Sequence, residues 1–227
     1  MIDSRSEGLL ADQLLVIVRE PRIRQAVYEE LGEYCHMCRN RLNSLKLSLF
    51  LAKKQSTGRR VEDWERIERH YVELERAVDR VQTICRPMTL SPVSIGLELL
   101  IEDRRAEWIR LMAESGCELE CVPPPARALA SFDVERMGQA LDALIRWRAG
   151  DPSPGRLARL RWWVEAGTAH LAWEEERSTP VRPSDEGATW NLPLLVRIVL
   201  AHGGDLRLTD DSDWRLRLSW PAAAGSP

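Results

Sequence analysis

A chain of 227 residues can bury one large hydrophobic core or two modest ones, and the length favours two domains. Hydrophobic residues make up 44% and charged residues 30% of the sequence, a composition that excludes disordered and membrane-embedded proteins. The net charge of −3 is too small to indicate nucleic acid or an anionic membrane as a partner. Because the N-terminal residues lack a secretory signal and no segment approaches the roughly 20 apolar residues of a membrane helix, we expect a cytoplasmic protein.

Two long helices with matching apolar seams are predicted in the first part of the chain. A short amphipathic helix at residues 9–20 precedes them and ends at Pro21. The first long helix runs from about residue 22 to residue 54, and the second begins at Val61. Their apolar residues are spaced alternately three and four apart, at Leu31, Cys35, Cys38, Leu42, Leu45, Leu49 and Ala52, and at Trp64, Ile67, Tyr71, Leu74, Val78, Val81 and Cys85. The short connector predicts an antiparallel hairpin, and because one hairpin cannot bury such a seam alone, we expect a homodimer built around a four-helix bundle.

One histidine lies just beside the first seam. Asn40 and Asn43 follow His36 by four and seven residues, so the imidazole and two amides share one face of the helix. Cys35 and Cys38 flank the histidine on the seam itself, in the middle of a helix and with no preceding strand. This placement favours core packing over a redox or metal site, and the odd total of five cysteines is typical of reduced thiols. We therefore expect no metal.

A segment with two prolines, at positions 87 and 92, separates the helical hairpin from a region in which helical and strand patterns alternate. We place a helical domain at residues 1–89, a second domain at 90–221 and a tail at 222–227. In chain order the pattern predicts a helix at 95–115, a strand at 117–122, a helix at 133–148 capped by Asp133, strands at 157–164 and 169–173, a helix at 192–201, and strands at 205–208 and 214–220. Residues 174–187 are predicted to be a loop, with Glu174–Glu176 as a solvated part of it. Helices interleaved with mainly antiparallel strands predict an α+β two-layer sandwich.

The stretch Tyr34–Leu42 resembles the H-box of two-component histidine kinases. In that family a phosphoaccepting histidine is followed by an acidic residue, an apolar residue, Arg, Asn or Thr, Pro and Leu. Here His36, Arg39, Asn40 and Leu42 match. Residues 133–145 resemble the N-box helix of the family, and residues 191–208 resemble its last helix and strand. The resemblance spans roughly residues 25–221 and implies a dimerisation and phosphotransfer hairpin followed by an α/β sandwich of the histidine kinase ATPase (GHKL-like) type.

The boxes that bind nucleotide in this family are degenerate here. The asparagines that hold magnesium in the family correspond here to Ala143 and Trp147. The box whose carboxylate binds adenine and whose glycine lets the backbone bend corresponds to Glu175 and Arg177. The glycines that approach phosphate correspond to Thr189 and Asn191. Because a backbone that approaches phosphate tolerates no side chain, we expect no ATP binding and no cofactor. Trp147 and Trp190 are predicted to fill part of the former nucleotide pocket.

The H-box also departs from the family pattern. Met37 stands where an acidic residue would accept the histidine proton, and Arg41 replaces the proline, so autophosphorylation is not expected. Receiving a phosphoryl group needs only an accessible imidazole and a partner with its own metal and aspartate.

The resemblance therefore implies a degenerate kinase core in which His36 is the phosphoacceptor, with Arg39, Asn40 and Asn43 around it. Such a protein would act as a histidine phosphotransferase, or as a docking and phosphatase partner, for a response-regulator receiver domain, with a sensor kinase as a further partner. Two alternatives stay open. One is an active sensor kinase with divergent boxes, and the other is a dimeric scaffold without phosphoryl chemistry.

Overall fold

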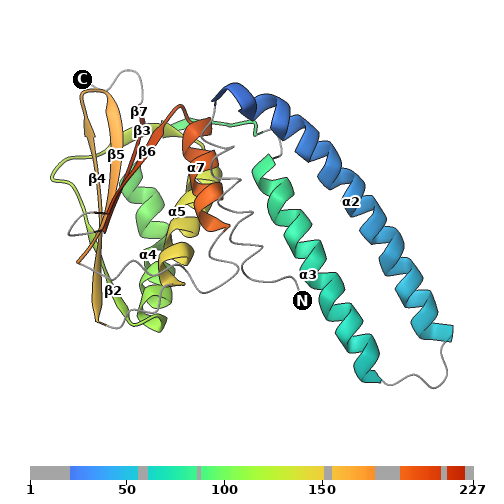
Figure 1. Ribbon diagram of the computed structural model, residues 1–227. Coiled ribbons are helices and arrows are strands. Elements are labelled where there is room, and N and C mark those ends of the chain that lie inside the picture. Colours follow the sequence, from blue (N-terminus) through green and yellow to red (C-terminus); the bar gives the residue numbers. More distant parts are fainter. Residues whose placement is uncertain are drawn as a thin grey trace. The chain divides into compact units, whose positions relative to one another are not determined.

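The computed structural model describes residues 21–55, 61–85, 88–150, 155–176, 190–210 and 214–222 (Figure 1). These residues fall into two compact units, one formed by residues 21–85 and the other by residues 88–222. The helix predicted at residues 9–20 lies outside the described residues. None of the helices in the described ranges is long and apolar enough to cross a membrane.

The first unit is a pair of long antiparallel helices, α2 (Pro21–Gln55) and α3 (Val61–Cys85). Seam residues from both helices are buried between them, among them Cys35 and Leu42 of α2 and Trp64 and Tyr71 of α3. Lysines of α2 pair with glutamates of α3 in antiparallel order: Lys46–Glu75 at 3.7 Å and Lys53–Glu68 at 2.7 Å. The predicted helical hairpin is therefore confirmed.

Each predicted seam is only partly buried within one chain. Leu45 of α2 remains 46% exposed and Leu74 of α3 remains 41% exposed, although both belong to the alternating three-and-four pattern. Apolar seam residues thus stay on the surface of a single hairpin.

The second unit is an α+β sandwich with a five-stranded sheet. The sheet has the strand order β2-β4-β5-β7-β6, in which β2 pairs parallel to β4 and all other neighbours are antiparallel. Its strands are β2 (Cys117–Val122), β4 (Arg156–Glu165), β5 (Thr168–Glu175), β6 (Asp205–Asp210) and β7 (Trp214–Pro221). The helices α4 (Leu97–Glu114), α5 (Val134–Ala149) and α7 (Asn191–Ala201) lie on one face of this sheet (Figure 1). The predicted fold class is confirmed.

The core of this unit lies between the sheet and the three helices. Alternate residues of β4, β5 and β7 point inward, which buries Trp162, Trp173 and Trp220 almost completely, and α4 adds Trp108. Burial of large aromatic side chains contributes strongly to stability because each removes a large apolar area from water.

Two short strands were not predicted. β1 (Val93–Gly96) pairs with β3 (Leu129–Phe132) in a separate two-stranded sheet, so α4 begins at Leu97 and not at residue 95. Four residues are too few to show a convincing period, which is why the pattern missed both strands. The loop predicted from residue 174 is also wrong at its start, because β5 continues through Glu175.

Asp133 connects three parts of the second unit. Its side chain accepts hydrogen bonds from the backbone N–H of Arg136 (3.0 Å), which caps α5, and from the backbone N–H of Ser91 (2.9 Å). Its own backbone N–H donates to Nε2 of His202 at the end of α7 (3.1 Å). Burial alone would raise the pKa of this carboxyl, but the two backbone donors, together with His202 and the charge of Arg136, outweigh burial and lower the pKa below its ordinary value.

Replacing this cap should destabilise the protein. Asp133→Ala should lower the free energy of unfolding by about 1 kcal/mol at neutral pH, whereas Asp133→Asn, whose amide oxygen still caps, should lose less. Because the folded-state pKa is lowered, the contribution of the charge is complete above the unfolded pKa of about 4 and is lost as pH falls through the folded value. Urea unfolding at neutral and strongly acidic pH measures this, and an Asp133→Ala effect that grows towards acid would contradict it.

Candidate functional site

His36, Asn40 and Asn43 lie on one exposed face of α2, as the spacing predicts. All three side chains are exposed, whereas Cys35 and Leu42 of the same helix point into the hairpin. The separation follows from the helical period, since residues four and seven apart fall on one side of the helix. The imidazole of His36 is therefore accessible to a partner.

The same exposed face continues into an apolar stretch that the sequence reasoning did not single out. Leu47 and Phe50 follow Asn43 by four and seven residues, and they are 60% and 57% exposed. Leu51 beside them is 47% exposed. Large apolar side chains gathered on a surface and rimmed by polar groups are typical of protein–protein contacts. The continuing three-and-four spacing after His36 was the signal that could have revealed this stretch. We call His36, Asn40, Asn43, Leu47, Phe50 and Leu51 the histidine stripe.

Arg39 lies one turn from His36 and forms an ion pair with Asp79 of α3 across the hairpin. Both side chains are close to half exposed, so the pair stabilises the hairpin by no more than about 1 kcal/mol. Breaking this ion pair therefore takes little free energy. The arginine is held near His36 but already has a carboxylate partner.

The cysteines beside His36 behave as packing residues. Cys35 is buried, and burial, followed by the neighbouring Cys38, raises the pKa of its thiol. A thiol with a raised pKa is a poor nucleophile and a poor metal ligand at neutral pH. Within the described residues no group of histidine, cysteine and carboxylate side chains is arranged to hold a metal ion.

The positions that correspond to the nucleotide boxes lie mainly around α5, β5 and the start of α7. Ala143 and Trp147 are buried on α5, and the guanidinium of Arg148 lies 5.5 Å from the Trp147 ring. Trp190, just before α7, is also buried, and Asn191 is the first residue of that helix. Arg177 and Thr189 lie outside the described residues. The filling of a former pocket by Trp147 and Trp190 stays a prediction.

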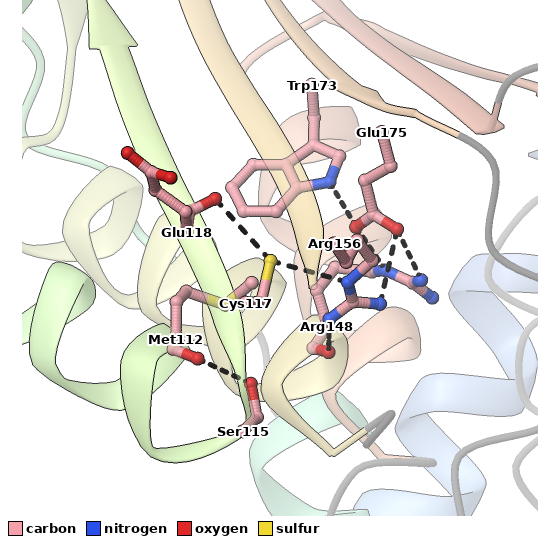
Figure 2. A network of polar contacts seen from close by, with 8 residues as sticks. All are labelled: Met112, Ser115, Cys117, Glu118, Arg148, Arg156, Trp173 and Glu175. Atoms are coloured by element: carbon pink, nitrogen blue, oxygen red, sulfur yellow. Dashed lines mark hydrogen bonds and ion pairs between the residues drawn. The ribbon is translucent and has the colours of Figure 1, made fainter. Parts of the chain in front are cut away.

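Glu175 is the centre of a buried polar cluster (Figure 2). Arg148 donates to both of its oxygens, from Nε to Oε1 at 2.8 Å and from Nη2 to Oε2 at 2.7 Å. Nε1 of Trp173 donates to Oε1 at 2.6 Å, and Nη1 of Arg156 donates to Oε2 at 3.3 Å. The side chains of Arg148, Arg156 and Glu175 are 5%, 2% and 0% exposed, so the cluster is essentially dry.

This arrangement saturates the carboxylate. Two carboxylate oxygens provide about four acceptor sites, and the four donors from Arg148, Trp173 and Arg156 occupy them. Glu175 therefore has no free acceptor site for an adenine amino group. The prediction that Glu174–Glu176 is a solvated acidic loop is wrong, because Glu175 is an inward-facing strand residue that neutralises buried arginine.

Arg156 connects the cluster to the rest of the core. Its Nη2 donates to the backbone carbonyl of Arg148 at 2.7 Å, and its Nε lies 3.4 Å from Sγ of Cys117 (Figure 2). Burial raises the pKa of the Cys117 thiol, although the hydrogen bond and the charge of Arg156 act in the opposite direction. Arg156 thus joins the start of β4 to the end of α5 and to β2.

Sequence reasoning did not predict that Arg148 and Arg156 are buried, although a signal was available for Arg156 and its partner Glu175. Arg156 precedes the inward-facing residues Ala158, Leu160 and Trp162 at intervals of two, and Glu175 follows Trp173 by the same interval. The alternation therefore places both charges on the inner face of the sheet. Opposite charges at inward positions of neighbouring strands indicate a buried pair.

Comparison with known proteins identifies the fold. A scan against protein-family models and a search of curated protein sequences each gave no match. Among solved structures, the Acinetobacter baumannii histidine kinase AdeS aligns with a TM-score of 0.57 and 15% identity, over 82% of this chain and 98% of that chain. A histidine kinase from Burkholderia phymatum STM815 aligns with a TM-score of 0.51 and 17% identity, over 99% and 100%. This chain has a histidine kinase-like fold.

A third structure, full-length ShkA in complex with AMPPNP, aligns with a TM-score of 0.58 and 15% identity. The alignment covers 88% of this chain and 47% of ShkA. At such identities the similarity concerns the fold, and the chemistry of this chain has to be argued from its own residues.

Removing the buried carboxylate should be strongly destabilising. Glu175→Gln leaves two buried guanidinium groups without their counter-charge and should lower the free energy of unfolding by roughly 3–5 kcal/mol. The matched control is Glu174→Gln, because Glu174 lies on the opposite face of β5 and pairs with the half-exposed Arg161 at 2.7 Å. That change should alter stability by less than about 1 kcal/mol. Equal effects of the two substitutions in urea unfolding would show that the buried cluster does not carry this stability.

Proposed function

We propose that this protein is a two-component signalling protein that exchanges a phosphoryl group at His36 with a response-regulator receiver domain, without binding ATP itself. The observation that carries the proposal is the saturated Glu175, because the carboxylate expected to read adenine is fully engaged by side chains of the chain itself. A core that keeps an exposed histidine but has lost its nucleotide site depends on another protein for phosphate.

Further support comes from the side chains at the other nucleotide positions. Ala143 and Trp147 provide no oxygen ligand where the kinase family has asparagines that hold magnesium. Magnesium requires oxygen ligands, so these positions cannot hold the metal that accompanies the nucleotide phosphates. The substitutions and the saturated carboxylate are independent, and both oppose ATP chemistry.

The reaction needs little from this chain beyond an accessible imidazole. The lone pair of a neutral His36 ring nitrogen attacks the phosphorus of an aspartyl phosphate on the receiver domain, and the bond from phosphorus to the aspartate oxygen breaks. The aspartate leaves as a carboxylate, with its charge balanced by the metal of the receiver domain. The other ring nitrogen of His36 keeps its proton. Transfer in the reverse direction follows the same path.

Neighbouring side chains have supporting roles in this proposal. Arg39 exchanges its surface contact with Asp79 for phosphoryl oxygens and neutralises their charge. Asn40 and Asn43 are amides on the exposed face and polarise the site. In the phosphatase direction, Asn40 orients a water molecule towards the aspartyl phosphate. The apolar part of the histidine stripe, Leu47, Phe50 and Leu51, supplies the contact area for the receiver domain.

The proposal includes a homodimer in which two hairpins form a four-helix bundle. Leu45 and Leu74 are the large apolar seam residues that remain more than a third exposed, and the histidine stripe lies on another side of α2. Dimerisation and partner docking therefore use different surfaces. In this scheme residues 1–89 form the dimerisation and phosphotransfer domain, and residues 90–221 form an ATPase-like domain that assists docking.

Phosphotransfer can be tested with a receiver domain that has been labelled on its aspartate. Labelled phosphate should appear on the protein or be released as inorganic phosphate. Transfer to the protein should be lost completely in His36→Ala, because the imidazole is the acceptor. His70→Ala is the matched control, because His70 is also an exposed helix histidine and should leave the reaction unchanged. Asn40→Ala should slow mainly the release of inorganic phosphate.

The alternatives predict different outcomes. An active kinase would incorporate label from γ-labelled ATP into the wild type and not into His36→Ala, whereas we expect no incorporation in either. A scaffold without phosphoryl chemistry would bind the receiver domain equally well in both and would move no phosphate. Either result would contradict the proposed function.

The dimer should depend on the exposed seam. The wild type should sediment as a dimer at micromolar concentration, and Leu45→Glu combined with Leu74→Glu should give a monomer, because each buried leucine contributes about 1.5–3 kcal/mol. Leu47→Glu is the control, since it places the same charge on the histidine stripe and should leave the dimer intact. A monomeric wild type would refute the bundle.

A further inference from the structure

The part of α2 that carries His36 has cationic side chains and no acidic ones. Between Tyr34 and Gln55 the sequence contains no aspartate and no glutamate, and its basic residues are Arg39, Arg41, Lys46, Lys53 and Lys54. The carboxylates that pair with this segment therefore come from α3, across the hairpin.

Ion pairs between the two helices follow one side of α2. Arg39–Asp79, Lys46–Glu75 and Lys53–Glu68 succeed one another in antiparallel order. Their basic residues are spaced by seven, which is about two helical turns and keeps them on the same side of α2. Arg39 lies within one turn of His36, whereas Lys53 follows His36 by 17 residues, about 25 Å along the helix. Asp79 is thus the carboxylate that holds the arginine next to the imidazole.

A phosphoryl group on His36 would compete with Asp79 for this arginine. It carries about 1.5–2 negative charges and three acceptor oxygens, and a guanidinium group can bind two such oxygens at once. Side chains three residues apart on a helix are neighbours, so Arg39 is within reach of the phosphoryl group. Arg39 and Asp79 are 44% and 45% exposed, and an ion pair this exposed to water is weak. The guanidinium can therefore move from Asp79 to the phosphoryl oxygens.

We propose that Asp79 is a positioning residue that holds Arg39 while His36 is free and thereby sets how far His36 is phosphorylated at equilibrium. The inference rests on the proposed phosphotransfer at His36. When His36 is phosphorylated, Arg39 leaves Asp79, so the phosphorylated form lacks an ion pair that the free form keeps. By thermodynamic linkage, this ion pair shifts the equilibrium towards free His36, whichever donor supplies the phosphoryl group. Asp79 acts only through Arg39.

The equilibrium between free and phosphorylated His36 tests the inference on the full-length protein. The phosphoryl donors are a phosphorylated receiver domain and, separately, phosphoramidate, a small molecule that phosphorylates histidine directly. Mass spectrometry of the peptide that contains His36 gives the phosphorylated fraction. Asp79→Asn should raise the equilibrium constant for phosphorylation about two- to fivefold, the effect expected from the loss of an exposed ion pair. Asp79→Glu keeps the carboxylate and should stay closer to the wild type.

Two controls separate this role from a general effect on the hairpin. Glu68→Gln removes the ion pair with Lys53, whose side chains are 46% and 55% exposed on Lys53 and Glu68, and should leave the equilibrium constant unchanged. In an Arg39→Gln background, Asp79→Asn should have no further effect, because the side chain through which Asp79 acts is missing. Circular dichroism establishes that each variant is folded.

Three results would overturn the inference. Asp79→Asn could leave the equilibrium constant at its wild-type value, or Glu68→Gln could raise it equally. An effect of Asp79→Asn that persists in the Arg39→Gln background would show direct repulsion between the carboxylate and the phosphoryl group. If the receiver domain delivers no phosphate to the wild type, the proposed function fails, whereas the phosphoramidate comparison still decides the role of Asp79.

Discussion

The second unit depends on how one buried carboxylate is satisfied. Glu175 is fully buried, and an ionised group in such a position is tolerated only when charge and hydrogen bonds surround it. Arg148 and Arg156 supply both, and through them the end of α5 and the starts of β2 and β4 are tied to the end of β5. The same contacts leave the carboxylate no acceptor site for a ligand. The interaction that completes this core therefore also explains why we propose a kinase-like fold without ATP binding.

In the first unit, the helix α2 has a buried side and a separate exposed side. The period of α2 places Cys35 and Leu42 against α3 and places His36 and Asn40 on an exposed face. Leu45 lies beside Leu42, on the side of the helix opposite His36, and remains exposed in a single chain. One helix can thus bury one side against its neighbour and keep an accessible histidine on another side. The histidine stripe gains an apolar continuation in Leu47 and Phe50, which suits contact with another protein.

The elements that were predictable had a strong period or a clear terminal signal. The hairpin helices, the N-cap at Asp133 and the strand pair around Gly167 all follow from such signals. β1 and β3 were missed because four residues give no period, and they are held as strands only by pairing with each other. Glu175 was misassigned because three successive glutamates suggest solvent, whereas the alternation after Leu171 and Trp173 continues through Glu175 and turns it inward.

By itself, the sequence determined the helical hairpin, the α+β fold class and the place of His36 on an exposed side of the first helix. These features depend on local period, capping and residue identity, which a single segment carries. Only the tertiary structure decided which charges meet. Arg148 and Glu175 lie 27 residues apart, and Arg156 reaches Glu175 only because β4 pairs with β5. Such pairings arise from strand register and from the packing of helices on the sheet, and no local pattern specifies them.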